Sequence, residues 1–157
     1  YLISLFAFLN KIMPVDLGQF FSFDWGGRPA HMSPRDFVLW ERFFIQHAKS
    51  FLGFHFDVSL GTPGVVPPDT DPSLVKMWER ITLKRIDVVG VKSNEWWLME
   101  FRPNAAGASL GAIITYRDLW LSDPPDAKSV ISAVVTDIPD PDLISTAFKN
   151  DVRVIVV

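Results

Sequence analysis

No cysteine occurs among the 157 residues of this chain. Disulfide bonds and thiolate metal sites are therefore excluded, whereas oxygen ligands for a metal ion remain possible. The chain also lacks an excess of positive charge, since 15 Lys and Arg stand against 18 Asp and Glu and the formal net charge is -3. Because affinity for the phosphate backbone comes mainly from Lys and Arg, this balance argues against a protein that grips nucleic acid over its whole surface.

The positive charges are nevertheless concentrated in one stretch of the chain. Five basic residues and only two acidic ones lie between positions 76 and 92, the basic ones being Lys76, Arg80, Lys84, Arg85 and Lys92. We expect an anionic partner to contact this stretch, although the same charges would also suit the solvated faces of ordinary elements.

The sequence also lacks an apolar run long enough to span a membrane. Residues 1–13 are apolar, but Asn10 and Lys11 interrupt them well before the roughly 20 residues that a bilayer helix needs. The basic leader and small-residue cleavage site of a signal peptide are missing too, so we expect no targeting or transmembrane segment. Residues 1–32 are interpreted as an aromatic docking segment, which either covers the core or contacts another subunit. Its aromatic residues near the end are Phe20, Phe21, Phe23 and Trp25.

The remaining residues, 33–157, are predicted to form a single α/β domain, because an apolar content of 48% is enough for one core. A helix should begin at the N-cap Ser33 and end near Gly53, with Glu41 inside its apolar stripe. That stripe is predicted to consist of Phe37, Trp40, Phe44, Ala48 and Phe51. Proline-rich residues 61–72 form a loop, and a short helix over 73–81 follows.

Strands and helices then alternate along the chain. Strands are predicted over 54–60, 83–91, 95–102, 130–136 and 152–157, and helices over 110–121 and 140–149. The resulting order is αβββαβαβ. Continuous valine and isoleucine in the last strand predict burial on both of its faces.

One pair of strands should bring two acidic residues together. If Ser93 and Asn94 form a two-residue hairpin turn, Lys92 pairs with Glu95, and the positions in every pair sum to 187 because 92 plus 95 is 187. Asp87 then lies opposite Glu100, and Arg102 shares their face because side chains two apart point the same way. A four-residue turn gives the same register, whereas a three-residue turn would move Glu100 away from Asp87.

Two ionised carboxylates this close repel each other, so the site needs a cation. A magnesium ion is one solution, since it binds through one or two carboxylates and keeps several waters for substrate phosphates. The other is an ion-pair lattice in which Arg85 and Arg102 neutralise Asp87 and Glu100.

Three motifs in this part of the chain resemble those of the PD-(D/E)XK nuclease superfamily, and in particular its small members encoded by tailed phages. They are RIDVVG at 85–90, WLMEFRP at 97–103, and LG at 110–111 followed by TYRDLW at 115–120. The resemblance covers about residues 33–135, and its specific part is confined to 85–120. It implies a restriction-endonuclease-like αβββαβ core with a mixed central sheet flanked by helices, to which this chain adds a C-terminal αβ extension.

The resemblance also implies roles for individual residues. Asp87 and Glu100 match the metal-binding acids, and Glu41 matches an acid that some members carry on the first helix. The predicted catalytic set is therefore Asp87, Glu100 and Arg102, with Asp87, Glu100 and Glu41 holding magnesium if the site is functional. Arg85 and Arg102 are predicted to contact phosphate.

Two departures from the family pattern affect the expected function. Arg102 stands where the family has the lysine that activates water, and a guanidinium group stays protonated and cannot act as a base. Gly111-Ala112 stands where phage relatives often have Gly-Gln. We therefore predict a nuclease-like fold with a degenerate active site.

The resemblance places such a protein among phage virion or head-tail connecting components, in the virion or the host cytoplasm. Its partners would be other virion subunits or further copies of itself, bound through the aromatic N-terminus. No membrane partner is expected. The alternative is an active magnesium-dependent DNA endonuclease or exonuclease, for which DNA is the partner.

Overall fold

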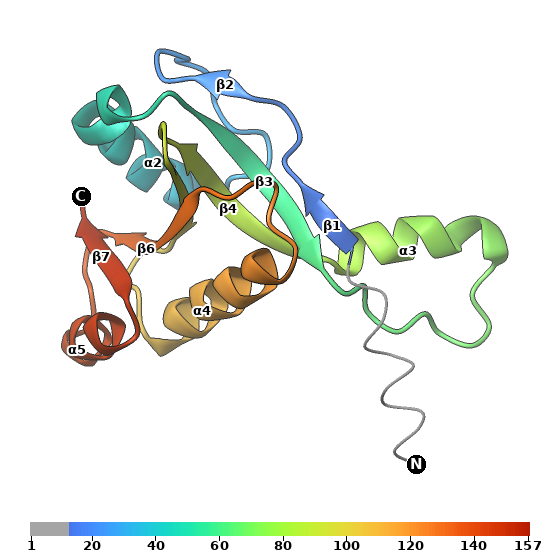
Figure 1. Ribbon diagram of the computed structural model, residues 1–157. Coiled ribbons are helices and arrows are strands. Elements are labelled where there is room, and N and C mark those ends of the chain that lie inside the picture. The colour runs from blue at the N-terminus through green and yellow to red at the C-terminus, as the bar shows by residue number, and fades with distance from the viewer. Residues whose placement is uncertain (1–12) are drawn as a thin grey trace.

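A computed structural model describes residues 13–157, so the predictions for the first twelve residues lie outside the described part. Within it, the chain forms a mixed, open seven-stranded sheet and four α-helices (Figure 1). The strand order is β1-β3-β4-β5-β6-β7, with the short β2 also paired to β3. In that order, β1, β3, β4 and β5 are joined by antiparallel pairing, whereas β5, β6 and β7 run parallel. The predicted α/β class is confirmed.

The elements follow the predicted order, with two additional strands at the start. The strands are β1 (Met13–Asp16), β2 (Phe21–Ser22), β3 (Gly53–Gly61), β4 (Lys84–Val91), β5 (Glu95–Phe101), β6 (Ser129–Thr136) and β7 (Val152–Val156). The α-helices are α2 (Pro34–His47), α3 (Val75–Thr82), α4 (Gly107–Ser122) and α5 (Pro141–Lys149). None of the described helices is long and apolar enough to cross a membrane.

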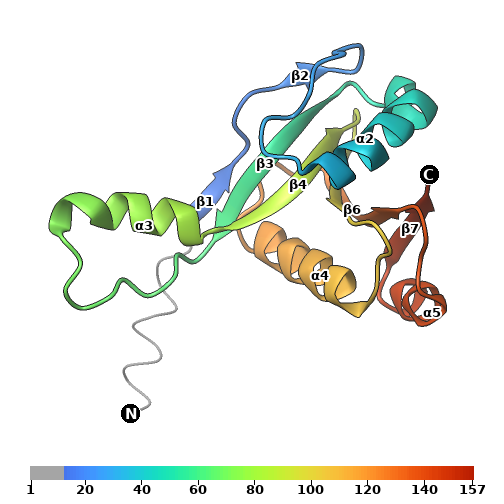
Figure 2. The same cartoon turned by 180° about the vertical axis from the view of Figure 1, so that it is seen from behind.

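The sheet separates two apolar cores (Figure 2). On one face, α2 contributes Leu39, Trp40 and Phe43 to a largely aromatic cluster. On the other face, α4 contributes Ile113 and Trp120, and α5 adds further apolar side chains. Helix α3 instead extends away from both cores, beyond the end of β3 and β4 (Figures 1 and 2).

Ser33 caps α2 as predicted, because its hydroxyl oxygen accepts the backbone N–H of Asp36 at 3.2 Å. The predicted buried stripe is confirmed, since Trp40, Ala48 and Phe51 are buried and Phe37 and Phe44 are partly buried against the same core. Leu39 and Phe43 are buried as well, so the apolar face is wider than predicted, whereas Glu41 is exposed and lies outside it. The prediction assumed one continuous helix as far as Phe51. The α-helix ends at His47 and a 3-10 turn follows, so the turn, and not helical periodicity, buries the later apolar residues.

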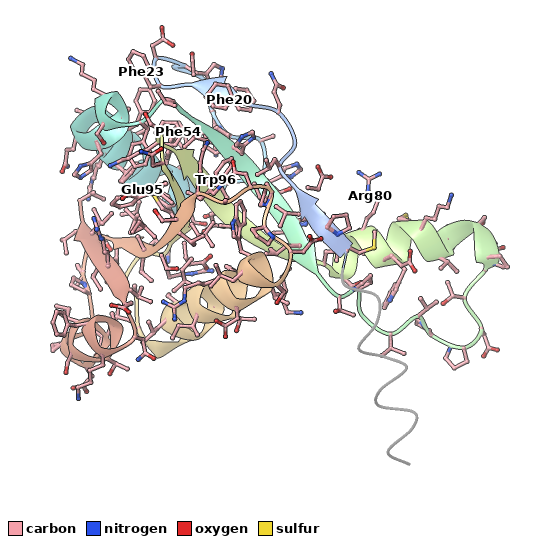
Figure 3. The ribbon with its side chains drawn as sticks, viewed as in Figure 1. Phe20, Phe23, Phe54, Arg80, Glu95 and Trp96 are labelled. Atoms are coloured by element: carbon pink, nitrogen blue, oxygen red, sulfur yellow. The ribbon has the colours of Figure 1, made fainter. Side chains whose placement is uncertain are left out.

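Part of the aromatic docking segment belongs to the sheet, since β1 and β2 both pair with β3. Phe21 and Trp25 pack on Phe56, which places these rings against the core. Phe20 and Phe23 remain 48% and 42% exposed. Figure 3 shows them beside β2, at the end of the molecule opposite to α3. The described part of the segment, residues 13–32, thus combines core packing with an exposed aromatic surface.

The predicted burial of the last strand on both faces is wrong. Strand β7 lies at the edge of the described sheet and pairs only with β6. Val152 is buried, but Val156 is 53% exposed. A run of valine and isoleucine reflects preference for extended backbone as well as burial, and here the edge position decides the burial.

The Ser33→Ala variant should lower the free energy of unfolding by about 1 kcal/mol, because α2 loses its N-cap hydrogen bond. Urea unfolding followed by circular dichroism measures this difference. The exposed Ser93 provides the matched control, and Ser93→Ala should change stability by less than about 0.5 kcal/mol. Equal stabilities of wild type and Ser33→Ala would show that the cap is not a stabilising element.

Candidate functional site

The β4–β5 hairpin has the predicted register. Val91 pairs with Trp96 and Val88 with Met99, so the paired positions sum to 187. The backbone N–H of Lys92 donates to the carbonyl of Glu95 at 3.0 Å and closes the two-residue turn. The prediction from turn length is confirmed for this hairpin.

The paired part of the hairpin ends at Val88 and Met99, one residue before Asp87 and Glu100. Continuation of the register would pair Phe101 with Ile86. Instead, the Phe101 N–H donates to Oδ2 of Asp87 at 2.8 Å. A side-chain carboxyl group thus takes the place of a backbone acceptor where β4 and β5 separate.

The neighbouring strand β3 is irregular at the same level. Its register places Asp57 opposite Asp87, because Phe56 pairs with Val88 and Val58 with Ile86. Asp57 has a φ angle of +54°, in the left-handed region that residues other than glycine seldom adopt.

At this level of the sheet, the side chains of β3 and β4 also change from one apolar core to the other. Phe56 and Val88 pack with the α2 core, whereas Val58 and Ile86 pack with the α4 core. Residues two apart in a regular strand would share one face. In each strand, the face that packs on the α2 core is therefore exchanged with the face that packs on the α4 core at the aspartate, which is Asp57 in β3 and Asp87 in β4.

Arg102 closes the site on its solvent side. Its Nη2 lies 2.9 Å from Oε1 of Glu100, and the two side chains are 54% and 4% exposed. The backbone N–H of Arg102 is fixed by the carbonyl of Val135 on β6. A buried carboxylate without a cation would be strongly destabilising, so this ion pair accounts for the charge of Glu100.

The two acids are held in different protonation states. Burial, and then the negative charge of Glu100, raise the pKa of Asp87 to about 8. Burial also raises the pKa of Glu100, but the hydrogen bond from Arg102 opposes that rise, and Asp87 hydrogen-bonds to it as well. We therefore assign the proton to Asp87 at neutral pH, with Glu100 ionised against Arg102.

Two further residues act on the site from the flanking helices. Asp36, in the first turn of α2, adds to the negative potential at Asp87 and Glu100. Tyr116 of α4 lies close enough that the acids contribute to its raised pKa of about 12, after the larger effect of burial. The pair thus lies between the start of α2 and the middle of α4.

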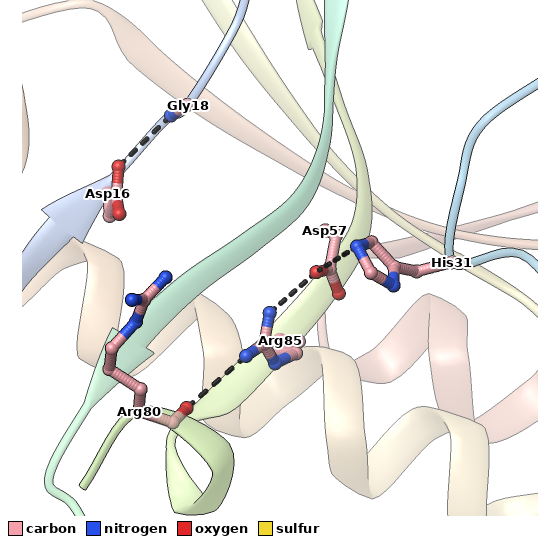
Figure 4. Close-up of polar contacts among 6 residues, drawn as sticks. All are labelled: Asp16, Gly18, His31, Asp57, Arg80 and Arg85. Carbon is pink, nitrogen blue, oxygen red and sulfur yellow. Dashed lines mark hydrogen bonds and ion pairs between the residues drawn. The ribbon is translucent and has the colours of Figure 1, made fainter. Parts of the chain in front are cut away.

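Not all the predicted site residues come together. Asp87, Glu100 and Arg102 form one cluster, but Glu41 lines a separate cavity of about 140 Å³ with Trp25 and Trp40. The guanidinium group of Arg85 bonds to Asp57, as Figure 4 shows, and not to the acid pair. The predicted lattice of two arginines on two acids is therefore formed only by Arg102.

Sequence reasoning did not identify Asp57, His31 or Tyr116 as neighbours of the site. Asp57, His31 and Asp87 line a small cavity of about 20 Å³, roughly the space of one water molecule. Tyr116 lies inside the TYRDLW motif at 115–120 and could have been found by placing that motif on a helix packed against the sheet. No local sequence signal marks the left-handed backbone of Asp57, beyond the tolerance of aspartate for it.

A metal ion at this site would have two carboxyl groups as ligands. Magnesium accepts such a site when waters complete its shell. It would have to displace both the proton of Asp87 and the guanidinium group from Glu100. Among residues 13–157, no group of three or more His, Cys, Asp or Glu side chains is arranged to hold a metal ion.

Comparisons with protein-family models, with curated proteins and with solved structures find no match to this chain.

The proton on Asp87 should make stability depend on pH. Between about pH 4 and pH 8 the folded chain binds a proton at Asp87 that the unfolded chain has released, so the free energy of unfolding falls as pH rises. The slope contributed by this one group is at most about 1.4 kcal/mol per pH unit, and it vanishes above about pH 8. Urea unfolding across this range measures it.

Asp87→Asn should flatten that dependence, because the amide resembles the protonated acid and does not ionise. Asp118→Asn, at an exposed position, is the control and should leave the wild-type slope unchanged. The same slope in wild type and Asp87→Asn would contradict the assignment of the proton to Asp87.

Proposed function

We propose that this chain is a PD-(D/E)XK-like domain with a degenerate active site, which serves as a non-catalytic building block of a tailed-phage virion or head-tail connection. The phage assignment comes from the resemblance of the motifs at residues 85–120. The order α2, β3, β4, β5, α4, β6 supports the nuclease-like core, and α5 with β7 forms the proposed extension. The mixed sheet with helices on both faces is consistent with it.

The contact between Arg102 and Glu100 is the observation that carries the proposal. At 2.9 Å, the guanidinium group already supplies the positive charge that Glu100 needs. Asp87 needs none while it holds its proton. The charge of the acid pair is therefore balanced by groups of the chain itself. Arg102 also cannot act as a base, so it cannot activate water as the family's lysine does.

One observation favours the alternative of an active magnesium-dependent nuclease. Asp87 and Glu100 come from adjacent strands at the point where these strands separate, as two metal ligands would require. Buried acids with a strongly raised pKa are also common at functional sites. In that case magnesium would replace the proton and move Arg102 toward substrate phosphate.

A manganese titration distinguishes these two functions. We expect no manganese-dependent rise in the melting temperature of the wild type and no DNA cleavage with magnesium or manganese. Arg102→Gln leaves Glu100 without its cation, so manganese should stabilise this variant by mass action. The double variant Glu100→Gln/Arg102→Gln should lose that stabilisation. Metal-dependent cleavage by the wild type that disappears in Glu100→Gln would overturn the non-catalytic proposal.

The assembly role is proposed for the β2 patch, which we define as Phe20, Phe23 and Leu52. These side chains are 48%, 42% and 53% exposed. The Phe23 N–H donates to the carbonyl of Leu52, and the ring of Phe20 packs over Gly53, so the patch has a fixed backbone. An exposed aromatic cluster on a fixed backbone suits a protein interface, where aromatic residues contribute most of the binding energy.

Phe23→Ser should weaken self-association by about tenfold or more while leaving the fold intact, since aromatic anchors dominate interfaces. Sedimentation equilibrium measures the association, and circular dichroism checks folding. Phe148→Ser is the matched control, because Phe148 is 84% exposed on α5, which lies remote from β2 in Figure 1. Monomeric behaviour of all three proteins, or equal weakening in Phe148→Ser, would count against a self-assembling β2 patch.

A further inference from the structure

A third cavity, of about 730 Å³, lies between β1, β3 and the junction of α3 with β4. Its volume falls in the range of about 300 to 1,000 Å³ that is typical of small-molecule sites. Its polar wall includes two guanidinium groups, those of Arg80 and Arg85, together with the hydroxyl of Ser59. We call it the arginine cavity.

Arg85 is held in place on one wall of the arginine cavity. Its Nη1 bonds to Oδ2 of Asp57, and its Nη2 donates to the backbone carbonyl of Arg80 at 3.2 Å (Figure 4). His31 approaches the same Asp57 oxygen at 3.7 Å. Two of the five N–H groups of Arg85 are thus occupied and three remain for a ligand.

The guanidinium group of Arg80 differs from that of Arg85 in its hydrogen-bond partners. The backbone carbonyl of Arg80 accepts from Arg85, but no described residue forms a hydrogen bond or an ion pair with its guanidinium group. Figure 4 shows this group turned into the space between Arg85 and Asp16. With no partner among residues 13–157, the guanidinium group of Arg80 has its complete planar set of donors available to a ligand.

The opposite wall carries acceptors. Oδ1 of Asp16 accepts the N–H of Gly18 at 3.1 Å, which leaves its other oxygen for a donor. The charge of Asp57, in contrast, is already matched by Arg85. The same ion pair offsets the charge of Arg85, so the positive charge without a described counter-ion on this wall is that of Arg80. An anionic group therefore belongs beside Arg80, with the remaining N–H groups of Arg85 as further donors, and neutral hydroxyl or amino groups belong beside Asp16.

We propose that the arginine cavity binds the phosphate ester of a nucleotide, with the phosphate on Arg80 and Arg85 and the sugar or base toward Asp16. Two guanidinium groups that line one cavity suit an anion with three or more oxygens better than a single carboxylate, which one fork already satisfies. The concentration of basic residues between positions 76 and 92 favours the same anionic ligand.

The arginine cavity is distinct from the acid pair, although it adjoins it. Asp57 and His31 line both the arginine cavity and the small cavity that contains Asp87. Arg80 has no part in the hydrogen bonds of Asp87 or Glu100. Nucleotide binding here is therefore independent of whether the acid pair binds a metal, and it can fail or succeed separately from the proposed function.

Isothermal titration calorimetry with deoxyadenosine monophosphate tests this site without added metal. Arg80→Gln should weaken binding by about tenfold or more, since it removes charge-assisted hydrogen bonds to phosphate. The fold should survive, because no described residue depends on the Arg80 guanidinium group for a contact. Lys76→Gln is the matched control: it removes the same charge from α3 but lies outside the arginine cavity, and should change affinity by less than about twofold.

Three further ligands define the chemistry. Deoxyadenosine and inorganic phosphate should each bind more weakly than the monophosphate, because each lacks half of the proposed contacts. A single-stranded tetranucleotide that binds more tightly than the monophosphate would identify a nucleic-acid strand as the source of the phosphate, and equal or weaker binding would identify a free nucleotide. Undiminished binding by Arg80→Gln, equal loss in Lys76→Gln, equal binding of deoxyadenosine, or no binding of any phosphate ligand to the wild type would overturn the proposal.

Discussion

The hydrogen bond from the Phe101 N–H to Asp87 Oδ2 is the interaction on which this architecture depends. Where β4 and β5 separate, it gives the buried Phe101 N–H an acceptor. An unpaired N–H group inside the sheet would destabilise the fold. The same hydrogen bond also fixes the Asp87 side chain beside Glu100. On the other side of β4, the left-handed backbone of Asp57 allows β3 to turn over at the same level. The irregularity of β3 and β4 at this one level therefore accounts for two features: the exchange of faces between the two cores, and the close approach of Asp87 to Glu100.

Charge balance explains why such a pair can persist in a stable domain. Two ionised carboxylates in this environment would repel each other and lose their hydration. The chain avoids this by protonating Asp87 and by pairing Glu100 with Arg102, which remains half exposed and keeps contact with water. A lysine at that position would offer a point charge on a flexible stem, whereas arginine gives a planar fork that stays charged. Arg102 thus stabilises the buried acid of this site, and its guanidinium group cannot act as a base.

Much of this arrangement could be predicted from local sequence rules. The turn at Ser93 and Asn94 determines the hairpin register, because the side-chain period of a strand leaves no freedom once the turn length is set. The capping residue Ser33 marks the start of α2 for an equally local reason. These rules place Asp87, Glu100 and Arg102 together, and they do so without knowledge of the rest of the fold.

The features that sequence rules missed depend on contacts between distant segments. Arg85 pairs with Asp57 because β3 turns over beside it, and no pattern within either strand encodes that turn. Glu41 is exposed on α2 and lines a cavity with Trp25, a contact between distant segments that places it apart from the acid pair. Strand β7 likewise lies at the edge because no further described strand pairs with it, and its own composition does not encode that position.

Two arginines have separate proposed roles: Arg102 supplies to Glu100 the positive charge that a metal ion would otherwise supply, and Arg80 is proposed to bind an anionic ligand. The central claim is the first, that the guanidinium group of Arg102 and the proton of Asp87 satisfy the acid pair without a metal ion. Anomalous diffraction from crystals soaked in manganese at pH 7 tests it most directly. The account predicts no manganese peak between Asp87 and Glu100, with Arg102 still hydrogen-bonded to Glu100. A manganese ion coordinated by both carboxylates, with Arg102 displaced from Glu100, would contradict it.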